Sequence, residues 1–170
     1  MGSTPPSAVM RHHLNPCMLM AHTGEVEIST LLGSCISVCL WDSTRACGGM
    51  NHYMLPLWNG AGLPTPKFGN VAIEKLIEKL LQFGCQKRNL VAKCFGGASL
   101  IADATGIMQI GARNIAVAEE VLEIHQIPII AREVGGQQGM RVIFNTQSGV
   151  ALVGRFVPQV APPTSLGHRQ

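Results

Sequence analysis

Residues 26–56 read VEISTLLGSCISVCLWDSTRACGGMNHYMLP and decide how we expect the chain to fold. Two short runs rich in β-forming residues, 26–32 and 36–41, flank Gly33-Ser34, so we expect a strand, a tight turn and a strand. After a cluster of turn-type residues, residues 47–55 can run back as an antiparallel partner. The stretch therefore predicts a β-hairpin behind a tight turn.

Beyond the hairpin, the hydrophobic spacing alternates between helical and strand-like. Two segments carry apolar residues on helical spacing, 71–81 and 112–126. Residues 90–95 read as a strand, and a closing strand meander is expected over 127–134, 141–145 and 150–156. The predicted class is α+β: a single-domain layered sandwich of mixed, largely antiparallel β-sheet, with two main helices packed on it.

Composition limits the size and kind of protein. The 170 residues are 46% hydrophobic and 14% charged, which is enough apolar material for one buried core. Residues 1–15 are polar, contain proline and lack periodicity, so we expect a disordered leader. The domain is then expected over 16–158, followed by a polar tail over 159–170.

Charge and cysteine usage exclude several function classes. A net charge of +3 without a basic run gives no footprint for nucleic acid. No run of about 18 apolar residues and no signal-peptide layout is present, so we expect a cytoplasmic protein without membrane insertion. The six cysteines are scattered and form no C-x-x-C, so we expect reduced thiols and no metal site.

Cys35 and His52 face each other in the simplest register of the hairpin. A turn centred between Ser43 and Thr44 pairs residues whose numbers sum to 87, and 35 and 52 meet this condition. Opposed residues of an antiparallel pair have Cβ atoms about 4.5–5.5 Å apart, which brings a thiol within hydrogen-bond reach of an imidazole. An adjacent imidazolium shifts a thiol with a free pKa of about 8.5 toward the nucleophilic thiolate. The hairpin thus predicts a catalytic pair.

Two glycine-containing segments bear on this site. Gly33-Ser34 precedes Cys35, and successive backbone N–H groups at such a turn can stabilise the oxyanion of an attacked amide. Gly48-Gly49 is a place where a β-bulge could slip the pairing by one residue. In that case His22 or His125 would be the alternative base.

Six ordered blocks of the chain are familiar as a set. The first two are residues 29–38 and 48–56, which contain Cys35 and His52. The later ones are KCFGGA at 93–98, IGARN at 110–114, and the glycine-rich runs at 134–139 and 145–149. Together these blocks, spread over roughly residues 17–156, resemble the chemoreceptor glutamine deamidase family, CheD.

This resemblance implies hydrolysis of glutamine side chains on methyl-accepting chemotaxis receptors. Cys35 would attack the carboxamide carbon, while His52 would protonate departing ammonia and activate the water that cleaves the thioester. No metal or organic cofactor is needed. The family also uses an upstream hydroxyl to orient the histidine, and here both Ser29 and Thr30 qualify.

The resemblance also extends the expected site and fold. It places Phe95 and Gly96 near the catalytic face, where they join Gly33 and Ser34 as candidates for substrate or oxyanion binding. It implies the fold of cysteine hydrolases of the cytotoxic necrotizing factor type.

Two other functions share these residues. One is a binding module that docks and stimulates a CheC-type chemotaxis phosphatase with little catalysis of its own. The other is a cysteine protease or transglutaminase-like acyl transfer, which shares the thioester step. A thiol opposite an imidazole at an open turn favours the enzyme over the scaffold.

Overall fold

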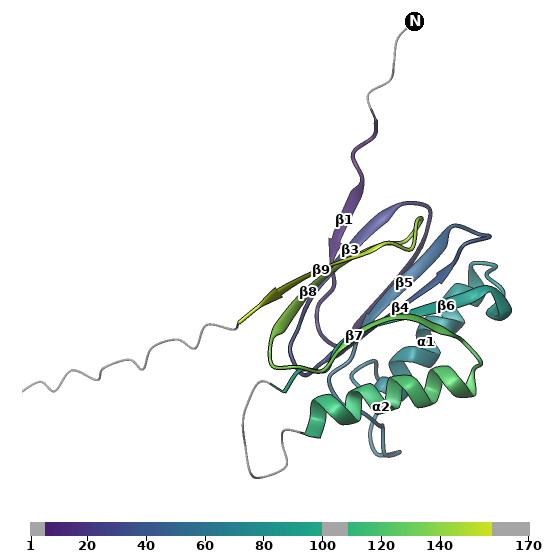
Figure 1. Cartoon of the computed structure of the whole chain (residues 1–170). Coiled ribbons are helices and arrows are strands. Elements are labelled where there is room, and N and C mark those ends of the chain that lie inside the picture. Colours follow the sequence, from purple (N-terminus) through teal and green to yellow (C-terminus); the bar gives the residue numbers. More distant parts are fainter. Residues whose placement is uncertain (1–5, 100–108, 158–170) are drawn as a thin grey trace, which may run out of the picture.

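The computed structural model describes residues 6–99 and 109–157 of the protein. In these ranges, helices α1 (Gly69–Gln82) and α2 (Gln109–Ile124) pack on one face of a five-stranded sheet, and a four-stranded sheet covers its other face (Figure 1). The predicted α+β layered sandwich is confirmed. The predicted tail over 159–170 lies outside the described residues.

The two sheets differ in size and share no strand. The five-stranded sheet has the order β2 (Met18–Thr23), β5 (Cys47–His52), β4 (Ile36–Asp42), β6 (Leu90–Gly96) and β7 (Ile129–Val134). The four-stranded sheet has the order β1 (Met10–His13), β3 (Val26–Leu32), β8 (Gly139–Asn145) and β9 (Ala151–Phe156). The pairs β1–β3 and β6–β7 are parallel and the others are antiparallel.

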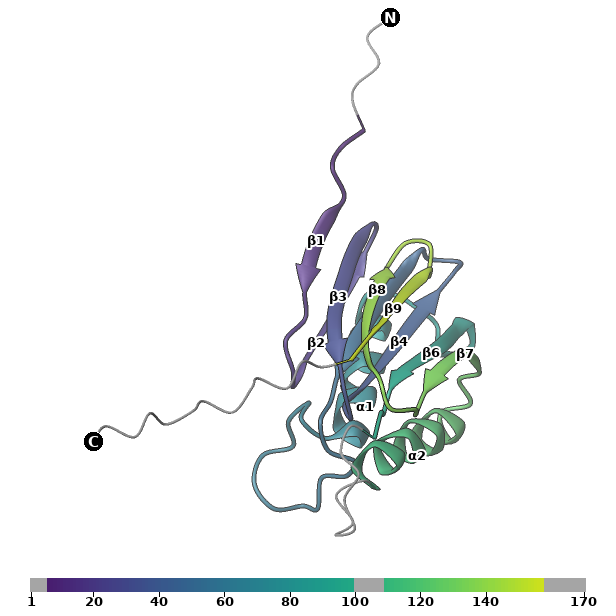
Figure 2. The same cartoon turned by 60° about the vertical axis from the view of Figure 1, so that its left-hand side comes forward.

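Strand β4 separates two apolar cores. Its residues Ile36, Val38 and Leu40 face the helices, whereas Cys39 faces the second sheet, because successive side chains of a strand point to opposite faces. The helix-side core includes the apolar stripe of α1, whose spacing of three and four residues buries one side of that helix. The second core lies between the sheets, which stand face to face in Figure 2.

The predicted strand, tight turn and strand are present, and the Gly33-Ser34 turn carries the chain from β3 in one sheet to β4 in the other. The predicted closing meander is wrong for the described residues: β7 lies parallel to β6 in the five-stranded sheet, whereas β8 and β9 belong to the other. A helix between β6 and β7 provides the long crossover that parallel strands require.

The first two strands of the structure were not anticipated. Residues 10–13, which the sequence analysis places in the leader, form β1 beside β3, and Leu14 after them is only 2% exposed. All four residues of β1 are exposed, so the alternation that marks a half-buried strand is missing from this segment.

The hairpin of β4 and β5 forms, but its predicted register is wrong by two. The closing pair is Asp42 with Cys47, so paired residue numbers sum to 89 and Cys35 is not opposite His52. The buried carboxylate of Asp42 accepts hydrogen bonds from the backbone N–H groups of Thr44 (2.9 Å) and Arg45 (3.2 Å), which builds a longer turn. A shift of two residues preserves the faces of both strands, because the period of a strand is two.

Gly49 lies in this regular ladder without a bulge, at a close approach of α1. A Cβ there would lie 2.6 Å from the Met20 carbonyl oxygen and 2.7 Å from Leu76 Cδ1. We therefore expect Gly49→Ala to lower the free energy of unfolding by about 1–3 kcal/mol through overpacking. Denaturant unfolding measures this loss. Gly154→Ala is the control, because nothing lies within 4 Å of a Cβ at that position, and equal stability of both variants would contradict the close approach.

Candidate active site

Cys35 lies on the turn between the two sheets, one residue before β4. It is half-buried and packs against the core between the sheets. Two backbone bonds hold its turn in place: Gly97 N–H donates to the Cys35 carbonyl (2.8 Å) and Ala98 N–H donates to the Gly33 carbonyl (2.9 Å). The nucleophile candidate therefore sits on a fixed turn.

Gly96 makes this attachment possible. Its φ is +102°, in the region that favours glycine, and a Cβ at this position would collide with the Cys35 carbonyl oxygen. Its neighbour Phe95 is 3% exposed and belongs to the core between the sheets. Gly96 thus lies against Cys35, while Phe95 pairs with Ser37 and belongs to the core against which Cys35 packs. Substrate binding by either residue stays a prediction.

His52 ends strand β5 and is 2% exposed. Its Nδ1 lies 2.7 Å from Thr30 Oγ1, and the Thr30 hydroxyl donates its proton to the Leu14 carbonyl oxygen (2.8 Å). Because a hydroxyl has one proton, Thr30 can only accept from the imidazole, so Nδ1 carries the proton. The Nε2 atom is then unprotonated, and it is buried without a hydrogen-bond partner among the described residues. This arrangement presents a lone pair suited to a base.

Ser29 points away from this site. Its Oγ lies 3.5 Å from His13 Nδ1, and it lines an open hollow of about 280 Å³ on the outer face of the four-stranded sheet, together with Arg11 and Arg141. Adjacent strand residues face opposite sides, so only one of the two hydroxyls can contact His52. Of the two candidates from the sequence, the structure brings Thr30 to the histidine.

Burial sets the protonation state of the pair. It lowers the pKa of His52 to about 4, with a smaller effect of nearby His13, and it raises the pKa of Cys35 above that of an ordinary thiol, with a smaller effect of Cys17. At neutral pH the pair is therefore a thiol and a neutral imidazole. The expectation of a thiolate stabilised by an imidazolium is not supported.

The thiol and the imidazole share one face but are not hydrogen-bonded. Within residues 6–99 and 109–157, no hydrogen bond joins Cys35 Sγ to His52, contrary to the predicted direct contact, because the register places His52 opposite Ser37. The alternative bases lie elsewhere: His22 pairs with Gly48 at the far end of β5, and His125 lies near Glu74. His52 remains the histidine at the Cys35 end of β5, where the next residue, Tyr53, pairs with Ile36.

Two polar contacts at the site were missed by sequence reasoning. Cys17 N–H donates to the His52 carbonyl (2.8 Å), and the buried side chain of Asn114 on α2 donates to the Ser34 and Met54 carbonyls (3.0 Å each). An asparagine on the buried side of a helix is a signal that sequence analysis could have used, because it has poor helix propensity and needs polar partners.

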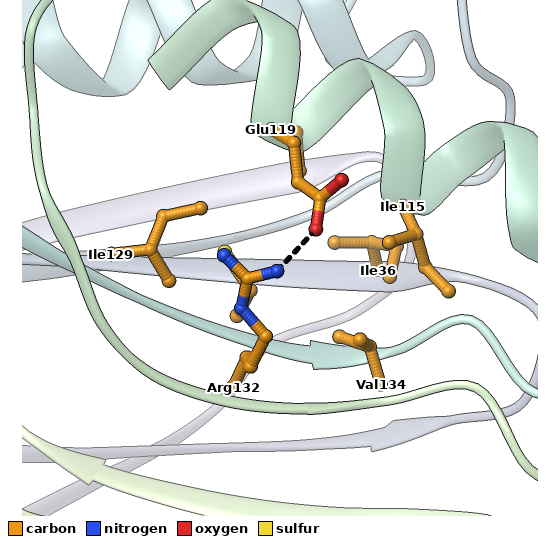
Figure 3. A pocket seen from close by; sticks show the side chains of 8 residues that line it. Ile36, Ile115, Glu119, Ile129, Arg132 and Val134 are labelled. Carbon is orange, nitrogen blue, oxygen red and sulfur yellow. Dashed lines mark hydrogen bonds and ion pairs between the residues drawn. The ribbon is translucent and has the colours of Figure 1, made fainter. Parts of the chain in front are cut away.

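A second hollow lies between α2 and strands β6 and β7, and the side chains that line it fill it. Ile36, Ile115 and Val134 converge there beside the ion pair of Arg132 with Glu119 (2.5 Å), and no space for a water molecule remains (Figure 3). In the part of the chain that the structure describes, no group of three or more histidine, cysteine or acidic side chains is arranged to hold a metal ion. The described helices are also too short or too polar to span a bilayer.

The chain belongs to the CheD family. The family model, described as CheD chemotactic sensory transduction, matches residues 54–155 and so begins just after His52.

Full-length relatives extend this similarity across the site. A protein of Trichlorobacter lovleyi is 48% identical over 149 residues, which cover 88% of this chain and 92% of that protein. One of Sulfurimonas denitrificans is 49% identical over 123 residues, which cover 72% and 79%. Both carry the name "Probable chemoreceptor glutamine deamidase CheD". The resemblance stated from the sequence is confirmed.

Proposed function

We propose that this protein hydrolyses the carboxamides of glutamine side chains on chemoreceptors and converts them into glutamates. Membership of the CheD family and the names of its relatives support this reaction class. One observation carries the chemistry: the hydrogen bond between Thr30 and His52 leaves Nε2 as an unpartnered lone pair on the face of Cys35. Without that orientation the thiol would lack a base.

The first half-reaction forms a thioester. As Cys35 Sγ attacks the carboxamide carbon, its proton passes to His52 Nε2, and the proton then moves to the departing nitrogen, which leaves as ammonia. Because the resting pair is neutral, proton transfer accompanies attack. A rotation of the thiol toward Nε2, or the arrival of substrate, then forms the hydrogen bond that the resting pair lacks.

The second half-reaction consumes one water molecule. Nε2 removes a proton from the water, whose oxygen bonds to the thioester carbon. The carbon–sulfur bond then breaks, and Nε2 returns the proton to the departing sulfur, which gives glutamate, the free thiol and the neutral imidazole. In both halves we assign the oxyanion to the turn before Cys35. Its carbonyls at Gly33 and Cys35 are occupied by donors from the end of β6, while no described residue accepts a hydrogen bond from the Ser34 N–H.

A protein substrate fits the surroundings of the site. Two methionine side chains are exposed at the end of β5: Met18 (53%), which pairs with His52, and Met54 (38%), whose sulfur lies 3.4 Å from Cys17 Sγ. Methionines and other apolar side chains gathered at one place are typical of surfaces that bind proteins. This apolar rim would contact the receptor segment that carries the glutamine. We further propose that the protein acts in the cytoplasm.

Incubation with a receptor cytoplasmic fragment tests the proposal. Mass spectrometry should find a gain of about 1 Da at particular receptor glutamines, with one ammonia released per conversion. Peptide cleavage or amine incorporation at the same sites would instead indicate a protease or a transglutaminase. Binding of a CheC-type phosphatase without any conversion would favour the docking function.

Thr30 and Ser29 provide a matched pair of variants. We expect Thr30→Val to lower the deamidation rate by about tenfold or more, because the buried Nδ1–H loses its acceptor and the tautomer of His52 is no longer fixed. Ser29→Ala, on the opposite face of the same strand, should retain the wild-type rate. Initial rates of ammonia release measure both. Equal effects of the two substitutions would exclude Thr30 as the orienting hydroxyl.

A further inference from the structure

Asn114 is a fully buried polar residue on helix α2, and the reaction scheme above does not use it. Its Nδ2 group donates to two carbonyl oxygens, those of Ser34 and Met54, each at 3.0 Å. Its own backbone carbonyl accepts a hydrogen bond from the Tyr53 hydroxyl (2.5 Å). All three partners lie within two residues of Cys35 or His52.

The two carbonyls belong to segments that separate at the site. Ile36 and Tyr53 exchange backbone hydrogen bonds of 3.1 and 3.0 Å, and this is the last rung between the nucleophile segment and the histidine strand. Beyond it, the N–H groups of Met54 and Leu55 both donate to the Lys67 carbonyl. The Ser34 carbonyl therefore accepts no hydrogen bond from a neighbouring strand, and the Asn114 side chain donates to it instead.

Close packing of helix α2 fixes Asn114 at the point where the two segments separate. The next residue, Ile115, packs beside Ile36, which directly follows Cys35 (Figure 3). Gly111, one turn earlier, lies so close to the carbonyls of Gly97 and Ala98 that a Cβ would come within 2.8 Å of both oxygens. The amide therefore acts from a rigid element.

We propose that Asn114 is a positioning residue for the reaction, which rests on the proposed function. Its two N–H groups tie the residue before Cys35 to the segment after His52 and so fix the separation of the thiol from Nε2. Misplacement by about 1 Å can lower a rate 10²-fold. The effect should fall on kcat, because Asn114 contacts neither substrate nor the reacting atoms.

Two substitutions separate the hydrogen bonds from packing. Asn114→Ala removes the side chain, whereas Asn114→Asp keeps its shape but replaces both N–H donors with a carboxylate. Thr146→Val is the control, because Thr146 is equally buried and its hydroxyl bonds Val26 N–H (3.0 Å) and the Gly24 carbonyl (2.6 Å), at the start of β3 and away from Cys35. It should cause a comparable loss of stability elsewhere in the fold.

Steady-state kinetics and hydrogen exchange form the test. We expect both Asn114 variants to lower kcat by about 10- to 100-fold with little change in KM, while Thr146→Val keeps kcat. Amide exchange should accelerate in the segments around residues 33–36 and 53–55 for the Asn114 variants only. An unchanged kcat, or a loss equal to that of Thr146→Val, would overturn the proposal.

The exchange experiment does not depend on the substrate. If the wild type converts no receptor glutamine, the proposed function fails. Faster amide exchange around residues 33–36 and 53–55 in the Asn114 variants would then still support the claim that Asn114 links these two segments. If amide exchange in those segments is unchanged in both Asn114 variants, Asn114 does not link the two segments, whatever the activity of the wild type.

Discussion

Replacing Cys35 with alanine will abolish glutamine deamidation while the protein stays folded. The substitution deletes the only atom proposed to bond to the substrate, so no thioester can form. Cys35 is half-buried at a turn, so the loss of one sulfur leaves little cavity, and the stability should change little.

Two measurements check this expectation. Mass spectrometry of the receptor fragment should find no conversion above the uncatalysed rate, and thermal unfolding should remain close to that of the wild type. Cys85→Ala, which removes a buried thiol after α1, should keep its activity. Residual activity of Cys35→Ala above a few per cent of the wild type would contradict the assignment of Cys35 as the nucleophile.

The second large effect is expected for His52→Asn. The asparagine amide can occupy the place of Nδ1 and still donate to Thr30, so the substitution removes Nε2 while sparing the orienting contact. We expect the loss of general acid–base catalysis to lower the rate by about 10²- to 10⁴-fold. The fold should survive.

The pH profile identifies the base. Because the pKa of His52 is lowered to about 4, its Nε2 is unprotonated above that pH, and wild-type activity should stay level from about pH 5 to 8. In His52→Asn the reaction needs a preformed thiolate. Since burial raises the pKa of Cys35, the residual rate should increase about tenfold per pH unit through this range. Profiles of the same shape in both proteins would show that His52 is not the base.

The register of the hairpin differs from the predicted one, yet Cys35 and His52 still share one face of the sheet. The assumed turn opposed Cys35 to His52, whereas the carboxylate of Asp42 builds a longer turn and moves the register by two residues. The pair survived because an even shift preserves the faces of both strands. A shift of one residue would have sent His52 into the helix-side core.

The apolar alternation of β3 already distinguishes Ser29 from Thr30 in the sequence. Residues Val26, Ile28 and Leu32 are all buried on one face of β3, and this alternation of apolar residues places Thr30 on the same face. The pattern was available in the sequence. Chain spacing to Cys35 does not distinguish the two hydroxyls, because the turn at Gly33-Ser34 changes sheets and breaks the parity.

The sequence by itself determined most elements after the first two strands, the fold class, the family and the candidate pair of Cys35 and His52, because local propensity, strand periodicity and ordered motifs are written along the chain. Only the tertiary structure decided how the strands divide into two sheets, which tautomer His52 adopts, and that Asn114 joins the two sides of the site. These depend on contacts such as Thr30 with Leu14 and Asn114 with Ser34, which lie 16 and 80 residues apart. Desolvation, which sets the protonation of the pair, likewise arises only when both sheets and the helices are assembled.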